Sequence, residues 1–415
     1  METIILDVMN HLQWYDDSLI RNKKNPKQNH ARVVKKHDLL KEKWYLHDMI
    51  NPEWIPSHVF SLVSKFTYIL PDHQPEDNKR NLKIVLYGRS EETCRRFMDD
   101  YSQRIRRWLG IMFHHKNTDN QKQNNRSTTK SCNVKSVTLH WLLLDVPRQT
   151  QIPSSQQKTH DTSQTYITQP HTIIPYDVNG AYTYPCQTDG LIVLFRIENA
   201  MKVLIHETVH LFGYDGSLDN NHNNEIIGVK RNNTSFEINL REVRCEVYAR
   251  LYSVGEVVHE MVTHGKIPSN NEAIRREFMR LLRKNAAWGI TRAHLLLRYA
   301  SGNTKGIIDI SPYVVMDNRP HRHVLNWYQE KTPAFSYYVA TGILLYALVG
   351  YPELMQIGEI HDIVRELFVV KGKPVKLRQP IMLAIWNDIE NELLHFETAK
   401  HNEVNTQSLS MFLAK

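Results

Sequence analysis

The stretch that decides the fold is GLIVLFRIENAMKVLIHETVHLFG, residues 190–213. Residues 190–196 are apolar and rich in branched side chains, which is typical of a buried strand. After a polar break, apolar residues resume at 201–212 and stop at Gly213, which predicts a buried helix that ends at a glycine. Within this helix His206 and His210 are four positions apart, so both lie on one face.

Two histidines one helical turn apart can occupy two corners of a tetrahedral zinc site. Glu207 stands beside them, where a carboxylate can accept a proton from an activated water. An apolar helix would hold three polar side chains at a high cost unless a partner such as a metal satisfied them. The pattern therefore predicts Zn²⁺ bound by His206 and His210, with Glu207 as the catalytic base. The alternative is a pair of structural histidines.

Residues 238–252, INLREVRCEVYARLY, predict a later helix capped by Asn239. Glu242 and Glu246 lie one turn apart on the same face of this helix. The pair resembles the gluzincin arrangement of thermolysin-like proteins, in which a ligand glutamate is followed four residues later by a carboxylate that hydrogen-bonds a ligand histidine. The resemblance implies Glu242 as the third ligand and Glu246 as that hydrogen-bond partner. Two alternatives stay open. Glu246 could be the ligand and Glu242 its partner, or both glutamates could form an exposed acidic stripe that pairs with neighbouring arginines.

Two other patterns are less suitable for the metal. The metzincin pattern, HExxHxxGxxH or D, places its third ligand three residues after the glycine. Gly213 fits this pattern, but the ligand position holds Gly216 and Asp215 falls one residue early, so a ligand directly after the helix is not expected. His259 and His264 are five positions apart, about 140° around a helix, and cannot share an ion. We expect this second pair at a solvated helix end.

Composition narrows the class of protein. The chain has 415 residues, of which 41% are hydrophobic, and suits two or three packed units. A net charge of +8 permits contact with nucleic acid, but no nucleic-acid motif favours it. The four cysteines form no CxxC pair, which argues against a disulfide framework and fits a reducing compartment. Without a signal-peptide pattern or a sufficiently long apolar stretch, the sequence predicts a cytoplasmic protein with no membrane contact.

The order of the predicted elements gives three regions and an α+β fold. Residues 1–80 should be helical, with helical apolar spacing at 4–14 and 59–70. Residues 81–236 should form a small mixed sheet with helices, and residues 237–415 an all-helical lobe. Within the middle region we expect strands at 82–88, 136–146, 178–185 and 190–196, a helix at 91–113 capped by Ser90, and polar loops at 116–133, 148–169 and 217–235.

Residues 178–217, VNGAYTYP…GLIVLFRIENAMKVLIHETVHLFGYDGS, resemble the predicted HExxH zinc metallopeptidases of large nucleocytoplasmic DNA viruses. That family has an Asn-Ser/Thr-Gly strand, a strand ending in Tyr-Arg, a Lys-Val-Phe-Ile-His-Glu helix and a Leu-Asp-Phe-Ser end. Asn179-Gly180, Phe195-Arg196, Lys202-Val203 and residues 214–217 occupy these places here. One residue is missing between Asn179 and Gly180, and Gly216 replaces the aromatic residue.

The resemblance implies a two-lobe zincin fold of the gluzincin type and hydrolysis of peptide bonds in the host cytoplasm or the virion. It also implies that residues 178–184 form an edge strand, which would bind extended peptide or protein substrate by strand addition. Asp215 would orient His210 or end the helix. Tyr337 and Tyr338 are candidate oxyanion donors, with His321 and His323 behind them, against a plain core or surface role for each.

Two functions from other classes remain open. A virion or scaffold protein could keep the zinc site for stability alone, although such a site has no use for a base such as Glu207. A basic nucleic-acid-associated protein would bind DNA tightly, and its affinity would fall steeply with added salt.

Overall fold

The computed structural model describes two compact units within the chain. The described residues are 8–10, 12–13, 27–68, 80–123, 132–146, 172–197, 199–215, 226–231, 234–300 and 329–351, with isolated positions between 354 and 391. Unit 1 comprises Met1–Pro147, Asn179–Asn220 and Tyr248–Phe278, and unit 2 comprises Arg148–Val178, Asn221–Val247 and Met279–Lys415.

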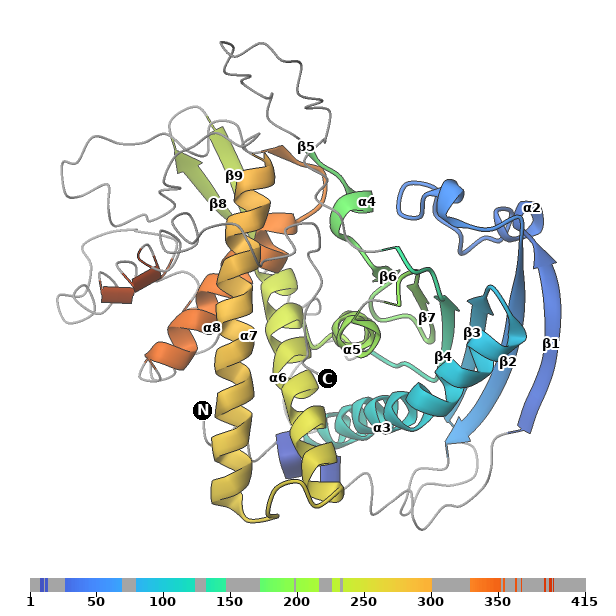
Figure 1. Cartoon of the computed structure of the whole chain (residues 1–415), viewed down its shortest axis with the longest axis horizontal. Helices are drawn as coiled ribbons and strands as arrows, with labels where there is room; N and C mark the ends of the chain where they lie inside the picture. The colour runs from blue at the N-terminus through green and yellow to red at the C-terminus, as the bar shows by residue number, and fades with distance from the viewer. Residues whose placement is uncertain are drawn as a thin grey trace, which may run out of the picture. The chain divides into compact units, whose positions relative to one another are not determined.

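Unit 1 is built on a six-stranded mixed sheet with the order β1-β2-β3-β4-β7-β6 (Figure 1). Its strands are β1 (Lys27–Lys35), β2 (His58–Tyr68), β3 (Arg80–Gly88), β4 (Ser136–Leu142), β6 (Ala181–Thr183) and β7 (Asp189–Leu194). β3, β4 and β7 are parallel, β1 and β2 extend them in antiparallel pairs, and the short β6 runs antiparallel to β7 at the opposite edge. The fold class is therefore α+β.

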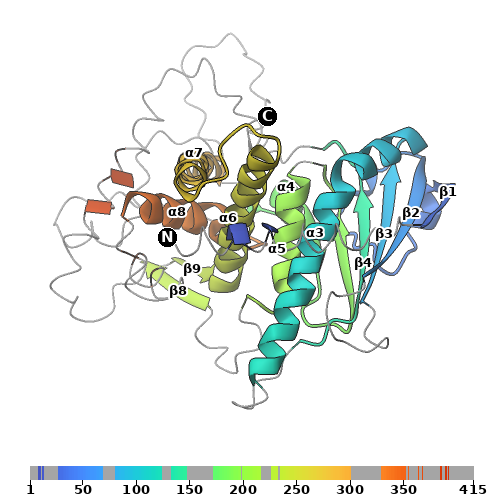
Figure 2. The same ribbon diagram turned by 90° about the horizontal axis from the view of Figure 1, so that it is seen from below.

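Both faces of this sheet are covered. On one face the helix α3 (Glu91–Gln123) runs along the strands (Figure 2), and Phe97 of α3 meets Trp141 of β4 edge-on at 4.6 Å. On the other face lies the segment between β1 and β2, with the short helices α2 (Lys36–Leu39) and η1 (Pro52–Trp54). Its Trp44 packs in one buried cluster with residues of β3 and β7. Burial of apolar side chains on both faces stabilises the sheet. β6 is the last strand of the sheet and therefore forms one of its edges.

Unit 2 combines helices with short strands. β8 (Ile226–Arg231) and β9 (Thr234–Asn239) form an antiparallel hairpin, while β5 (Thr172–Ile173) and β10 (Gln329–Glu330) pair in parallel. The helices are α4 (Pro175–Val178), the start of α6 (Leu240–Thr263), most of α7 (Asn271–Ala300), the π-helix η6 (Phe335–Ala340) and α8 (Thr341–Gly350). A side chain at Gly289 of α7 would lie 2.9 Å from the Cα of Gly342 in α8, so only glycine permits this close crossing. Among the described helices, none has both the length and the hydropathy to cross a membrane.

Several predicted elements are confirmed because their signals are local. Strands are present at 82–88 and 190–194 and helices at 91–113 and 201–211, and the strand expected at 136–146 is present but ends at Leu142. Ser90 caps α3 by accepting from the amide of Thr93 at 3.1 Å. The polar insertion at 148–169 lies outside the described residues.

Three expectations about secondary structure are wrong. β1 and β2 are strands within the region expected to be helical. The expectation failed because β2 is buried from both sides, so that its apolar residues at 59, 62 and 66 have the spacing of a helix. α3 continues through Gln123 into the expected loop at 116–133. The β8–β9 hairpin replaces part of the loop at 217–235, so the second lobe is not purely helical.

The expectation from the cysteines also needs correction. Cys132 and Cys186, 54 positions apart, form a disulfide, while Cys94 and Cys245 are buried and belong to no disulfide. The bridge joins the approach to β4 with the turn between β6 and β7. No local pattern indicates this disulfide, because the two cysteines meet only when the parallel strands β4 and β7 pair.

Candidate metal centre

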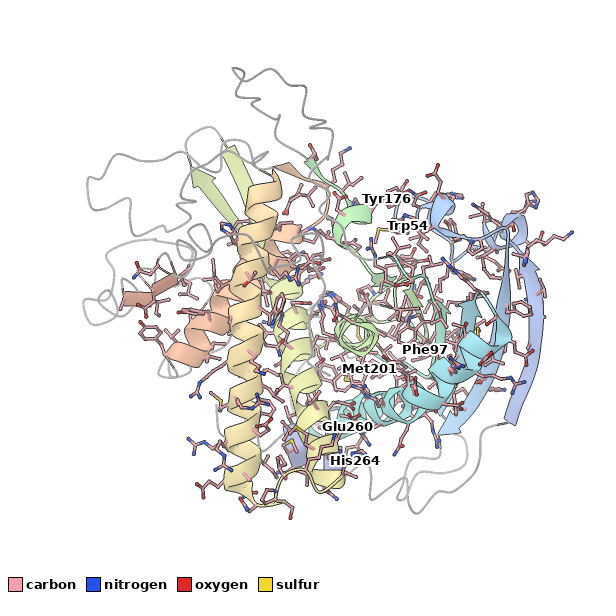
Figure 3. All side chains as sticks on the ribbon, in the orientation of Figure 1. Trp54, Phe97, Tyr176, Met201, Glu260 and His264 are labelled. Atoms are coloured by element: carbon pink, nitrogen blue, oxygen red, sulfur yellow. A yellow bond between two sulfur atoms is a disulfide. The ribbon has the colours of Figure 1, made fainter. Side chains whose placement is uncertain are left out.

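The two predicted ligand histidines lie on α5 (Ala200–Leu211), the helix that follows β7. Nearly every residue of α5 is buried, and the exposed fractions of His206 and Glu207 are only 7% and 8%. In Figure 3, Met201 marks this helix. Polar side chains held this deeply need polar or ionic partners, as the sequence predicted.

The separation of the two rings fits a shared metal ion. Nε2 of His206 and Nε2 of His210 are 3.2 Å apart. Two nitrogens at zinc-bond length from a tetrahedral ion would be about 3.3 Å apart. The same distance also fits a hydrogen bond between the rings, in which one Nε2 carries a proton and the other accepts it.

Asp215 fixes which nitrogen of His210 carries the proton. Its carboxylate is almost fully buried, and Oδ2 lies 2.8 Å from Nδ1 of His210. An ionised carboxylate only accepts, so Nδ1 of a neutral His210 carries the proton and Nε2 presents a lone pair towards His206. A histidine bonded to a carboxylate through its other nitrogen is a recurrent metal-ligand arrangement.

The end of α5 explains how Asp215 reaches back to His210. Gly213 adopts φ 72°, its amide donates to the carbonyl of His210, and the amide of Tyr214 donates to the carbonyl of Val209. These paired bonds form a Schellman motif, in which glycine takes the left-handed position. The reversal that Gly213 permits is what turns Asp215 towards the helix, and the sequence had predicted only the glycine stop.

The helix α6 carries both glutamates proposed from the sequence. Oδ1 of Asn239 accepts from the amides of Arg241 and Glu242, at 3.1 and 3.4 Å, which confirms the predicted N-cap. Glu242 is partly exposed in the first turn, and Glu246 is buried at 3%.

Within the part of the chain that the structure describes, two groups of side chains could hold a metal ion. Potential ligand atoms of His206, His210 and Glu242 all lie within 4.8 Å of one another. A second group with the same property is His210, Asp215 and Cys245. Glu242 belongs to the first of these candidate groups, and Glu246 belongs to neither.

The two candidate oxyanion donors lie in η6 of unit 2. The hydroxyl of Tyr338 donates to the carbonyl of Val178 at 3.4 Å, and the side chain is buried. Tyr337 is partly exposed and meets Tyr338 edge-on. The role of both tyrosines stays a prediction, and His321 and His323 lie outside the described residues.

Two buried residues near the motif were missed by the sequence argument. Cys245 is fully buried on α6, and Trp108 of α3 donates a hydrogen bond from Nε1 to the hydroxyl of Thr208 within α5. Neither residue has a local signal, since each reaches α5 only through tertiary packing. The expectation for His259 was wrong, because its exposed fraction is 3%, whereas His264 is exposed.

Comparison with known proteins adds no further assignment. No protein-family model, curated protein or solved structure matches this chain.

Proposed function

We propose that this protein is a zinc-dependent hydrolase that cleaves peptide bonds. The observation that carries the proposal is the facing pair of Nε2 atoms of His206 and His210, 3.2 Å apart on a buried helix, with Nδ1 of His210 held by Asp215. A binding role alone would not require Glu207 beside this pair. The strand β6 at the sheet edge and the helix α5 after β7 agree with the zincin fold that the sequence resembles.

Each residue then has one role. His206, His210 and Glu242 would hold the ion, and Asp215 would keep His210 in the tautomer that presents Nε2. A bound zinc ion would polarise a carbonyl and lower the pKa of water. Glu207 would accept the proton of the attacking water and transfer it to the leaving amine. The free edge of β6 would align extended substrate by main-chain hydrogen bonds.

The gluzincin assignment rests on Glu242 as the third ligand. It shares a group of potential ligand atoms with His206 and His210, which favours it over Glu246. Removing a ligand leaves two protein ligands, whereas removing a hydrogen-bond partner of a ligand weakens affinity by about 10–100-fold. Glu242→Ala should therefore abolish stable zinc binding, and Glu246→Ala should only weaken it. Chelator competition on both variants measures this, and the opposite order would exchange their roles.

Glu207→Gln tests the hydrolytic step. The variant should retain zinc, because Glu207 is not a ligand, and should lose hydrolysis of a fluorogenic peptide library by several orders of magnitude. The matched control is Glu53→Gln, an exposed carboxylate in η1 of the same unit, which should keep full activity. Comparable activity of Glu207→Gln and wild type would exclude Glu207 as the base. A zinc-loaded wild-type protein that cleaves no peptide would instead favour the structural alternative.

A further inference from the structure

One buried side chain contacts both helices that carry the proposed ligands. Trp108 lies on α3 with an exposed fraction of 1%, and its Nε1 donates to the hydroxyl of Thr208 on α5. The same indole packs edge-on against Tyr252 of α6, with ring centroids 4.7 Å apart. All three side chains belong to unit 1.

Thr208 is a sensitive place for such a contact. It lies between His206 and His210 in the motif, is fully buried, and donates its own proton to the carbonyl of Ile205 at 2.7 Å. The hydroxyl oxygen therefore accepts from Trp108 while its proton is already used. This bond attaches the middle of α5 to α3, in addition to the edge-on contact of Phe113 with Phe212 at the end of α5.

The contact of α3 with α6 is reinforced one turn away. Nε of Arg104 lies 2.9 Å from Oε2 of the fully buried Glu256 and 3.4 Å from Oε1 of Glu260, and Nη1 of Arg107 lies 3.6 Å from Oε1 of Glu256. Figure 3 labels Glu260 on this part of α6. These ion pairs attach α6 to α3, but they do not reach α5. Of the contacts named here, only those of Trp108 join α3 to both helices.

We infer that Trp108 is a positioning residue, which sets the position of α5 against α3 and against the part of α6 in unit 1, and so holds His206 and His210 in the arrangement that binds the ion. This inference rests on the proposed metal site. Thr208 lies between the two histidines on α5, so a shift of the helix at Thr208 displaces both imidazoles. Metal sites lose affinity and rate when supporting residues allow their ligands to shift.

The test compares two buried tryptophans. Trp108→Phe keeps an aromatic ring but removes the N–H donor. The matched control is Trp141→Phe, since Trp141 is also fully buried in unit 1 and donates from Nε1, at 3.4 Å, to the carbonyl of Arg196, which lies between β7 and α5 and in neither helix. We expect Trp108→Phe to lower Zn²⁺ affinity by about tenfold and to change the visible spectrum of the Co²⁺-loaded protein. Trp141→Phe should leave both within twofold of wild type.

A second variant removes the other half of the same bond. Thr208→Val deletes the acceptor and leaves Trp108 in place, and its effect on Zn²⁺ affinity should not add to that of Trp108→Phe in the double variant. The inference would be overturned if both single variants kept the Zn²⁺ affinity and Co²⁺ spectrum of wild type. It would also be overturned if Trp141→Phe lost as much Zn²⁺ affinity as Trp108→Phe. Either result would leave the proposed metal site intact. If wild type itself bound no metal, the proposed function would be wrong as well.

Discussion

Asp215→Ala is the perturbation whose size the structure predicts best. The carboxylate is 1% exposed and lies 2.8 Å from Nδ1 of His210, so the bond is buried and charge-assisted. Losing such a bond costs about 1.5–3 kcal/mol. The loss of a hydrogen-bond partner of a metal ligand typically lowers metal affinity by about 10–100-fold, or about 1.4–2.7 kcal/mol. The two estimates agree, so we expect a 10–100-fold weaker zinc affinity.

Competition with a chromophoric chelator at pH 7.5 measures this affinity directly. Asp215→Asn should fall between wild type and Asp215→Ala, because an amide oxygen can still accept from Nδ1 without the charge. Asp189→Ala is the control, since it removes an exposed carboxylate that accepts from Ser136 in the same unit. A folded Asp215→Ala variant with wild-type affinity would refute the role given to this residue.

Three further changes test local features of unit 1 and of α6. Burial, followed by the charge of a nearby lysine, lowers the pKa of His140 to about 4, below the usual 6.5, so its contribution to stability is complete above pH 6.5 and is lost as the pH falls towards 4. In urea unfolding between pH 7 and pH 5, the free energy of unfolding of wild type should fall by about 2 kcal/mol more than that of His140→Gln. The exposed control His37→Gln should show the same fall as wild type. Asn239→Ala removes the cap of α6 and should cost about 1 kcal/mol in the same assay, and an unchanged midpoint would contradict the cap. Gly213→Ala and Gly265→Ala both place a side chain at positive φ, and each should lower the free energy of unfolding by about 1 kcal/mol. Only Gly213→Ala should weaken zinc binding. Equal zinc affinities in the two variants would show that the conformation at the end of α5 does not affect the metal site.

The predictable parts of this protein are those encoded within one helical turn or one strand. The motif helix, the cap at Asn239 and the stop at Gly213 each follow from residues that lie three or four positions apart. The strand β2 could not be distinguished in this way, because burial from both sides removes the alternation that marks a strand. Its identity depends on pairing with β3, which no local pattern contains.

The candidate site shows the same division. The candidate histidines and Glu207 were evident from spacing, and Glu242 was named because the gluzincin pattern places a ligand glutamate on a later helix. The bond from Trp108 to Thr208 joins residues 100 positions apart, so only the packed structure reveals it. The same holds for Cys245, whose proximity to His210 and Asp215 depends on where α6 passes.

Metal content is the measurement that tests the central claim most directly. Elemental analysis of the purified protein, before and after reconstitution with Zn²⁺, should give about one zinc per chain for wild type. His206→Ala and His210→Ala should each lose it, because either change removes one of the two nitrogens that stand 3.2 Å apart. A wild-type protein that holds no zinc even after reconstitution would contradict the account. The imidazoles of His206 and His210 would then be joined only by a structural hydrogen bond.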